Sequence, residues 1–177
     1  MSWLIDEETV ADCRVMAETV TMRLELLSDQ LPRGFDALLS DAEADGHRHI
    51  GRLAAEFVSN RAMFHLIAAA TIENTLVGIG AMTDEPTHSH KPAHELAREP
   101  AHEPAWRMRR LYVHRDFRRR GVGQAIAAML HQGAVGKVRL VTVHAGNSDA
   151  AEFWAAMGFD PAVGKPWTHE MTLLGDA

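Results

Sequence analysis

The chain has 177 residues, of which 46% are hydrophobic and 24% are charged, a composition typical of one soluble globular domain with its own core. No apolar run is long enough to span a bilayer, and the first ten residues, MSWLIDEETV, carry acids where a secretory signal would carry Lys or Arg, so we expect a cytoplasmic protein without a membrane segment. A net charge of −6 is not that of a protein that binds nucleic acid over a broad basic face.

The first predicted element is an amphipathic helix over residues 10–31. Apolar residues recur there at steps of three and four, the spacing of one helix face: Val10, Cys13, Ala17, Val20, Leu24, Leu27 and Leu31. Pro32-Arg33-Gly34 ends the pattern. Cys13 is the chain's only cysteine and lies on this face, so we expect a buried, inert thiol, no intrachain disulfide and no cysteine-based zinc site.

Two further helices and a β-hairpin are predicted next. The helical spacing resumes at Leu38, Leu39 and Ala42 and continues after Gly46 through Ile50, Leu53, Ala54, Phe57 and Val58. The segments FHLIAAATI (64–72) and TLVGIGAM (75–82) have the composition of strands. Glu73-Asn74 between them predicts a tight hairpin turn.

Residues 83–105, TDEPTHSHKPAHELAREPAHEPA, differ in character from the segments on either side. They contain four prolines, four histidines and a duplicated PAHE. We interpret this segment as a loop with solvated histidines, because a zinc site needs three or four ligands that converge on an ordered backbone. The same interpretation applies to His47 and His49, so no metal site is expected.

The segment WRMRRLYV (106–113) is predicted to be an irregular strand. Trp106 and Met108 alternate in one phase, whereas Leu111 and Val113 fall in the other. A pleated strand directs alternate side chains to opposite faces, so a change of phase needs one extra residue, a β-bulge. We therefore predict a bulge near Arg109-Arg110, which would spread the neighbouring strands apart.

The rest of the chain alternates helices and strands. A helix is predicted from Gln124 onward, a buried strand at KVRLVTVH (137–144), a short helix at AAEFWAAMGF (150–159) and a final strand at WTHEMTLL (167–174). Strand–helix–strand units that follow a hairpin favour an α/β (α+β) fold with a mixed central sheet.

The turn before Gln124 combines arginines with glycines. Residues 106–120 hold seven arginines and one acid, Asp116, a local charge of +6 that leaves −6 − 6 = −12 for the rest of the chain. Gly121 and Gly123 then lead into a helix whose first N–H groups have no partner within the helix. Such a turn is suited to a single phosphate or pyrophosphate. The alternative is an exposed basic turn that only caps the helix.

Two known nucleotide-binding motifs do not fit this part of the chain. A dinucleotide fingerprint that begins at Gly121 would need a third glycine at position 126, where Ile126 stands. GAVGKV (133–138) is not a P-loop, because position 131 is His131 and Val138 replaces the required Ser or Thr. Neither nicotinamide nor ATP is favoured.

The stretch LYVHRDFRRRGVGQAIAAML resembles the acetyl-CoA-binding motif of the GNAT N-acetyltransferase superfamily, R/Q-x-x-G-x-G/A after a strand, here Arg118 to Gly123. GNSDAAEFWAAMGF is similar to the family's N-x-x-A-x-x-F-Y-x-x-x-G-F, with Asn147, Ala150, Phe153, Gly158 and Phe159 in register. The resemblance covers residues 64–174. It implies a single domain over 1–177, with N-terminal helices over 1–60, an inserted loop at 83–105, and a mixed sheet that is splayed between two central strands and flanked by helices.

The resemblance also implies contacts with the co-substrate acetyl-CoA. The backbone of Leu111 and Val113 would pair with the pantetheine arm, and Asn147 and Phe153 would contact that arm. Trp154 is expected among these contacts as well. It stands at the position where the family usually has a tyrosine that acts as the acid. The turn implied to hold the pyrophosphate consists of Arg118, Arg119, Arg120, Gly121, Val122, Gly123 and Gln124.

The implied reaction is direct attack of a primary amine on the acetyl thioester. The amine must first lose a proton, and the oxyanion needs a backbone N–H from the bulged strand. An indole cannot serve as an acid at neutral pH, so Tyr112 is the candidate acid, with Ser148 or a water as alternatives. The frequent glutamate base is replaced by arginine, which leaves His144 and Glu103 as candidate bases.

Three functions remain open at this point. The first is acetyl transfer to a primary amine of a small molecule or peptide, and the acidic rest of the chain favours a cationic acceptor such as a polyamine or an aminoglycoside-like molecule. The second is a catalytically silent module that binds CoA. The third, nucleic-acid binding, is not expected, because few stacking aromatics stand among the arginines. Homodimers are common in the superfamily, although no residue pattern here specifies one.

Overall fold

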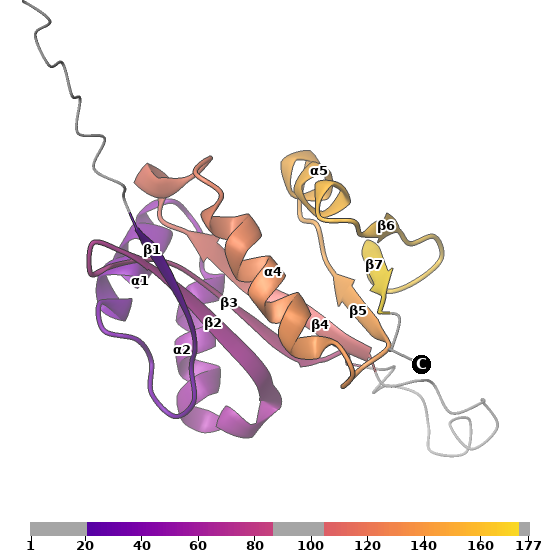
Figure 1. Cartoon of the computed structure of the whole chain (residues 1–177), viewed down its shortest axis with the longest axis horizontal. Coiled ribbons are helices and arrows are strands. Elements are labelled where there is room, and N and C mark those ends of the chain that lie inside the picture. Colours follow the sequence, from indigo (N-terminus) through magenta and orange to yellow (C-terminus); the bar gives the residue numbers. More distant parts are fainter. Residues whose placement is uncertain (1–20, 87–104, 174–177) are drawn as a thin grey trace, which may run out of the picture.

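A computed structural model describes residues 21–86 and 105–173 of the protein (Figure 1). Its strands form one seven-stranded sheet in the order β1-β2-β3-β4-β5-β7-β6, in which every neighbouring pair is antiparallel except β4 and β5. The strands are β1 (Met22–Leu26), β2 (Phe64–Ile72), β3 (Thr75–Asp84), β4 (Ala105–Val113), β5 (Leu140–Val143), β6 (Asp160–Pro161) and β7 (His169–Thr172). The helices are α1 (Phe35–Ala44), α2 (His49–Ser59), α4 (Val122–Ala134) and α5 (Ser148–Ala156), with short 3-10 turns at Arg61–Met63 and Arg115–Phe117. The predicted α/β fold with a mixed sheet is confirmed.

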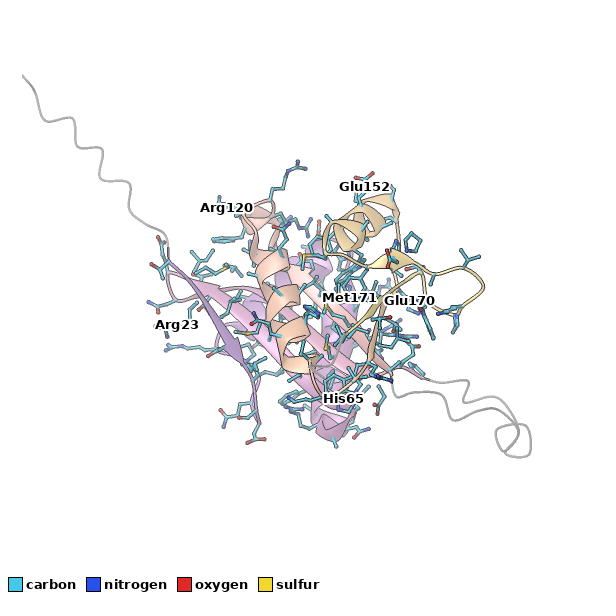
Figure 2. All side chains as sticks on the ribbon, turned by 45° about the vertical axis from the view of Figure 1, so that its right-hand side comes forward. Arg23, His65, Arg120, Glu152, Glu170 and Met171 are labelled. Carbon is cyan, nitrogen blue, oxygen red and sulfur yellow. The ribbon has the colours of Figure 1, made fainter. Side chains whose placement is uncertain are left out.

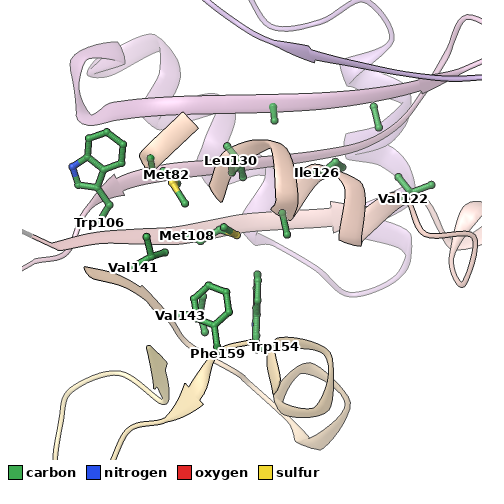
Figure 3. Close-up of a cluster of buried hydrophobic side chains, with 14 of the residues drawn as sticks. Met82, Trp106, Met108, Val122, Ile126, Leu130, Val141, Val143, Trp154 and Phe159 are labelled. Carbon is green, nitrogen blue, oxygen red and sulfur yellow. The ribbon is translucent and has the colours of Figure 1, made fainter. Parts of the chain in front are cut away.

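Helices cover both faces of the sheet and divide the core into two clusters. On one face α4 lies across β2, β3 and β4, with Ile126 and Leu130 fully buried (Figure 3). On the other face α1 and α2 pack against β3 and β4 through residues such as Leu38 and Ile50. Figure 1 shows the two layers on either side of the strands. Within the two described ranges, no helix is long and apolar enough to cross a membrane.

Residues 22–26 form an edge strand, which corrects part of the predicted helix over 10–31. β1 pairs antiparallel with β2, with Met22 opposite Ile72. MRLEL alternates apolar and charged residues, and Met22 and Leu24 pack against the core on the α4 side. Leu24 and Leu27 fit a helical spacing as well, so over this short stretch the pairing offered by β2 decides the conformation. Residues 10–20, with Cys13, lie outside the described residues.

The two helices predicted between residues 38 and 58 and the hairpin that follows them are confirmed. α1 and α2 have the predicted positions, and β2 and β3 are joined by Glu73 and Asn74. These two residues have φ values of 48° and 64°, the left-handed backbone that a two-residue type I′ turn requires. β3 extends to Asp84 and β4 begins at Ala105, and residues 87–104 of the predicted loop lie outside the described residues.

The predicted β-bulge is present in β4. Ala81 of β3 lies opposite Arg109 and Ile79 opposite Tyr112, so β4 has one residue more than β3 between these two pairs. Arg110 lies in this interval with a φ of 61°. As a result, four residues from both sides of the bulge contribute to the same core cluster on the α4 face: Trp106, Met108, Leu111 and Val113. Tyr112 belongs to the cluster on the opposite face.

β4 and β5 separate after three residue pairs, which confirms the splayed sheet. Ala105, Trp106 and Arg107 pair with residues 140–142, and β4 then continues to Val113 without β5 beside it. Figure 3 shows the side chains of Trp154 and Phe159 between β4 and α5, next to Val143. The splay leaves one backbone edge of β4 without a strand partner.

Candidate functional site

The turn that leads into α4 leaves the first backbone N–H groups of that helix without a capping side chain. Gly121 is the N-cap of α4 with a φ of 79°, and no side chain caps the helix. Arg119, two residues earlier, also has left-handed backbone, with a φ of 60°. The first N–H groups of a helix lack intrahelical partners and lie at the positive end of its dipole. This turn therefore has the features of an anion site.

Val113, Gly123 and Phe153 meet beside this turn. A Cβ placed on Gly123 would lie 3.5 Å from Val113 Cγ2 and 3.6 Å from Phe153 Cε2. The end of β4, the first turn of α4 and the middle of α5 thus come together at one point. Val113 and Phe153, which the resemblance assigns to the same ligand, are brought together by the fold.

The backbone of Leu111 and Val113 faces the splay. His114 donates its N–H to the carbonyl oxygen of Val77 in β3 at 2.8 Å. Hydrogen-bonding groups of an antiparallel strand alternate between its two edges, so those of Tyr112 face β3 and those of Leu111 and Val113 face the other way. β5 has separated from β4 at this level, so an extended ligand can pair with this edge.

Two carbonyl groups on this edge already accept hydrogen bonds from side chains. The oxygen of Val113 accepts from Arg118 Nε at 3.1 Å. The oxygen of Leu111 lies 3.2 Å from Nε2 of His49, the first residue of α2. The N–H groups of Leu111 and Val113 remain as the donors that this edge presents to the splay.

Carboxylates pair with most arginines of the basic segment, residues 106–120. The region of free positive charge is therefore smaller than the composition of this segment indicates. Arg107 contacts Glu85, Arg109 and Arg110 contact Glu56, Arg115 contacts Asp41, and Arg118 contacts Asp45. Among the described residues, Arg119 and Arg120 form no ion pair; the Arg120 guanidinium lies 5.2 Å from the centre of the Phe117 ring. Both are exposed, and Figure 2 shows Arg120 at the amino end of α4. The positive charge available to a ligand is thus concentrated beside Gly121.

Tyr112, the predicted acid, has a hydroxyl group that is bound by another side chain. The hydroxyl donates to Asp41 Oδ2 at 2.8 Å, and the same oxygen accepts the backbone N–H of Arg115 at 3.1 Å. Burial, followed by the bond to Asp41, raises the pKa of Tyr112. Burial alone would raise the pKa of Asp41, but the bonds from Tyr112 and Arg115 outweigh it and lower that pKa. These contacts favour a role in holding α1 against β4, and the role of Tyr112 as an acid stays a prediction.

The structure describes one of the two predicted bases, His144. His144 directly follows β5 and is exposed. Partial burial is the largest effect that lowers the pKa of His144. Repulsion from Arg107 and Arg109 lowers this pKa further, whereas attraction to Glu85 raises it. His144 is therefore neutral at pH 7, as a base must be. Glu103 lies outside the described residues.

The three residues at α5 that were predicted to contact acetyl-CoA have different environments. Asn147 is the N-cap of α5, and its Oδ1 accepts the N–H of Ala150 at 2.8 Å. Phe153 is partly buried, whereas Trp154 is buried. The ring centre of Trp154 lies 4.8 Å from that of Phe153 and 5.3 Å from that of Phe159. The contacts of Asn147, Phe153 and Trp154 with acetyl-CoA stay predictions.

Sequence analysis did not predict His49 and Glu85 as polar groups beside the splay. The interpretation of His49 as a solvated histidine is wrong, because it is half-buried in the first turn of α2 and its Nε2 lies 3.2 Å from the carbonyl oxygen of Leu111. The Glu85 carboxylate is fully buried; Arg107 contacts both of its oxygens, and Thr142 donates its hydroxyl to it. This cluster joins β3, β4 and β5 where the splay begins. Across the described ranges, no three His, Cys, Asp or Glu side chains converge as a metal site would require.

Comparisons with known proteins agree with this geometry. A sequence model of the acetyltransferase (GNAT) family matches residues 24–159, whereas a search of the curated proteins finds no match. A candidate acetyltransferase from Exiguobacterium sp. 255-15 superposes with a TM-score of 0.69 at 16% identity, over 86% of this chain and 94% of that one. AtaTR bound with AcCoA superposes with a TM-score of 0.62 at 16% identity, over 85% and 93%. An aminoglycoside acetyltransferase from an uncultured soil metagenomic sample, in complex with sisomicin, gives 0.58 at 17% identity, over 81% and 93%.

At these identities the solved structures establish a common fold. The family match spans most of the chain and includes the strand, the glycine turn and the following helix described above. This protein belongs to the GNAT acetyltransferase family.

Proposed function

We propose that this protein transfers the acetyl group of acetyl-CoA to a primary amine of a small molecule or peptide. The observation that carries the proposal is the uncapped, glycine-led start of α4 beside the unpaired backbone edge of β4. The first suits a pyrophosphate, and the second suits an extended arm that contains amide groups. The family match supports the same co-substrate.

The residues around the splay fit acetyl-CoA. The N–H groups of the turn at 118–124, with Arg119 and Arg120, would hold the pyrophosphate. The N–H groups of Leu111 and Val113 would pair with the pantetheine arm as an added strand would. Phe153 lies against the same turn and offers the arm an apolar surface. Asn147 is proposed as a further contact at the start of α5.

Bound acetyl-CoA supplies an electrophilic thioester carbon. The amine nitrogen bonds to this carbon as the carbon–sulfur bond breaks, the amine proton passes to a base, and the thiolate takes up a proton. The N–H of Leu111 is proposed as the donor that stabilises the oxyanion, because it is directed into the splay. His144 and Glu103 are the proposed bases, and Tyr112 is the proposed acid.

A cationic acceptor is proposed on the basis of charge. The chain carries −12 outside residues 106–120, which favours the approach of a polyamine, an aminoglycoside-like molecule or a basic peptide. One structure with this fold is an aminoglycoside acetyltransferase in complex with sisomicin, which supports including that class among the amines tested.

A catalytically silent CoA-binding module is the second candidate. Trp154 stands at the position of the usual tyrosine and is buried in the core. The hydroxyl of Tyr112, the proposed substitute, is held by Asp41. Both observations favour this alternative.

Release of free thiol from acetyl-CoA tests the proposal. The protein is incubated with acetyl-CoA and a polyamine, an aminoglycoside or a peptide with a free α-amine. Gly121→Asp and Gly121→Asn form a matched pair, because both residues tolerate left-handed backbone and they differ in charge. We expect amine-dependent thiol release, and acetyl-CoA binding about tenfold or more weaker in Gly121→Asp than in Gly121→Asn.

The other outcomes point to the other functions. Tight binding of CoA without turnover of any amine would support the silent module. Absence of CoA binding, together with a salt-dependent affinity for nucleic acid that Arg118, Arg119 and Arg120 carry, would overturn the proposal.

A further inference from the structure

His49 lies where the sheet opens, on the edge of β4 that faces the splay. It is the first residue of α2 and is half-buried, with Nε2 3.2 Å from the carbonyl oxygen of Leu111. That carbonyl faces away from β3, because the neighbouring Tyr112 is the residue that faces β3. The imidazole therefore borders the stretch of backbone that is proposed above to hold the thioester arm.

The contact with Leu111 determines which nitrogen of His49 carries the proton. A carbonyl oxygen only accepts hydrogen bonds, so Nε2 must be the donor. In the neutral ring the lone pair then lies on Nδ1, which has no hydrogen-bond partner in the part of the chain that the structure describes. A neutral imidazole that is anchored through one nitrogen is arranged to accept a proton on the other.

The groups that surround His49 keep it neutral at pH 7. Burial is the largest effect that lowers its pKa from the ordinary value of 6.5, and the neighbouring His47 lowers it further. Arg110 of β4 and Arg52 of α2 act in the same direction, whereas the bond to Leu111 opposes them. The Tyr112 ring packs 6.0 Å away, measured between ring centres.

His47 connects this side of the splay with solvent. Its ring centre lies 5.2 Å from that of His49, and its side chain is 46% exposed. Its Nε2 lies 3.3 Å from Asp45 Oδ2. A proton accepted by His49 therefore has polar groups between it and bulk water.

We propose that His49 is the general base of the transfer, an inference that rests on the acetyltransferase function proposed above. Nδ1 takes the proton of the attacking amine as the bond between the amine nitrogen and the acetyl carbon forms. The carbon–sulfur bond breaks, and the sulfur leaves as a thiolate. Nε2 keeps its bond to the Leu111 oxygen, which stabilises the imidazolium that results. His144 and Glu103 are the competing bases.

The variant His49→Gln removes the nitrogen that accepts the proton and keeps the hydrogen bond to Leu111. The glutamine amide can donate to the Leu111 oxygen, but it has no nitrogen that accepts a proton. With the amine that the wild-type protein acetylates fastest, we expect kcat to fall about 100-fold or more. In the wild-type protein, protonation of His49 should lower kcat below pH 6.5. This loss should be absent in His49→Gln. The dissociation constant of acetyl-CoA should change less than about twofold, because the bond to Leu111 is kept.

His65→Gln is the matched control. The Nε2 of His65 contacts Asp84 at 2.7 Å, and Figure 2 shows His65 at the opposite end of the molecule from Arg120. The same substitution there should leave kcat and its pH profile unchanged.

NMR of the imidazole nitrogens gives a readout that does not depend on turnover. In the ¹⁵N-labelled wild-type protein we expect His49 to be protonated on Nε2, to have a pKa below 6.5, and to shift when acetyl-CoA is added. Unmoved His49 signals in a protein that binds acetyl-CoA, or a wild-type kcat in His49→Gln, would overturn this inference and leave the proposed function intact. A wild-type protein that does not bind acetyl-CoA would overturn both.

Discussion

Asp45 and Arg118 form an ion pair that ties the end of α1 to the turn before α4. The same guanidinium donates through Nε to the carbonyl oxygen of Val113 and lies 5.4 Å from the centre of the Tyr112 ring. The end of α1, the end of β4 and the turn before α4 thus meet at one side chain. The first arginine of the motif therefore acts by fixing the turn, and its charge is not free for a pyrophosphate.

Removing the charge of Asp45 should weaken acetyl-CoA binding. Asp45→Asn preserves the size of the side chain and releases Arg118, so the turn is less ordered before the ligand arrives. We expect the dissociation constant, measured by isothermal titration calorimetry, to rise about 2- to 10-fold. Asp116→Asn is the control, because Asp116 is exposed and its ion-pair contact is with His114 at 4.0 Å. Tighter binding by Asp45→Asn would mean that Arg118 instead competes with the ligand for the Val113 oxygen.

Local sequence patterns predicted most of the elements around the site. The hairpin turn at Glu73-Asn74 and the bulge near Arg110 follow from a few adjacent residues, and both are present. β1 was missed because Leu24 and Leu27 continue the helical spacing of the residues before them, although MRLEL itself alternates apolar and charged residues. Its conformation depends on the edge of β2, which lies more than forty residues further along the chain.

The polar contacts of the site could not be predicted in this way. His49 bonds to Leu111 across 62 positions, and Tyr112 bonds to Asp41 across 71. The sequence identifies the arginines of the basic segment but not the carboxylates that neutralise them, because each partner comes from another element. Only after the fold is known does the charge at the turn reduce to Arg119 and Arg120.

The bond between Tyr112 and Asp41 should give the folded protein a distinct dependence on high pH. The pKa of Tyr112 is raised in the folded state, so above about pH 10 the unfolded chain loses a proton that the folded chain keeps. The free energy of unfolding therefore falls as the pH rises through this range. Tyr112→Phe should cost about 1–3 kcal/mol at pH 8, and less above pH 10.

Urea unfolding of both proteins at pH 8 and above pH 10 measures this difference. Tyr112 is the chain's only tyrosine, so the wild-type protein and Tyr112→Phe differ in one titrating group in this range. Equal pH slopes for the two proteins would show that the hydroxyl is not held as described.

Gly78 sets the approach of α4 to the sheet. A Cβ at this position would lie 2.8 Å from Ile126 Cδ1 and 3.1 Å from the Tyr112 carbonyl oxygen. Gly78→Ala should therefore push α4 outward and lower the free energy of unfolding by about 1–3 kcal/mol. Gly146→Ala is the control, because nothing lies within 4 Å of its added Cβ, and it should change stability by less than about 0.5 kcal/mol. Equal denaturation midpoints for the two variants would contradict this packing.

The Glu85 carboxylate should be one of the most stabilising polar groups at the base of the splay. Glu85→Gln leaves Arg107 largely buried without its counter-charge and removes an acceptor of Thr142. We expect the free energy of unfolding to fall by about 3 kcal/mol or more, as when one partner of a buried ion pair is removed. Lys165→Met, which breaks the more exposed pair between Lys165 and Glu170, is the control and should cost less than about 1 kcal/mol.

Hydrogen exchange locates the effect of Glu85→Gln within the sheet. Because Glu85 and Arg107 join β3 to β4 next to the three residue pairs that hold β5, the amides of Leu140–Val143 should lose protection first. The amides of β2, on the other side of β3, should keep theirs. Uniform loss of protection across the sheet would mean that Glu85 contributes to global stability without fixing the point at which β4 and β5 part.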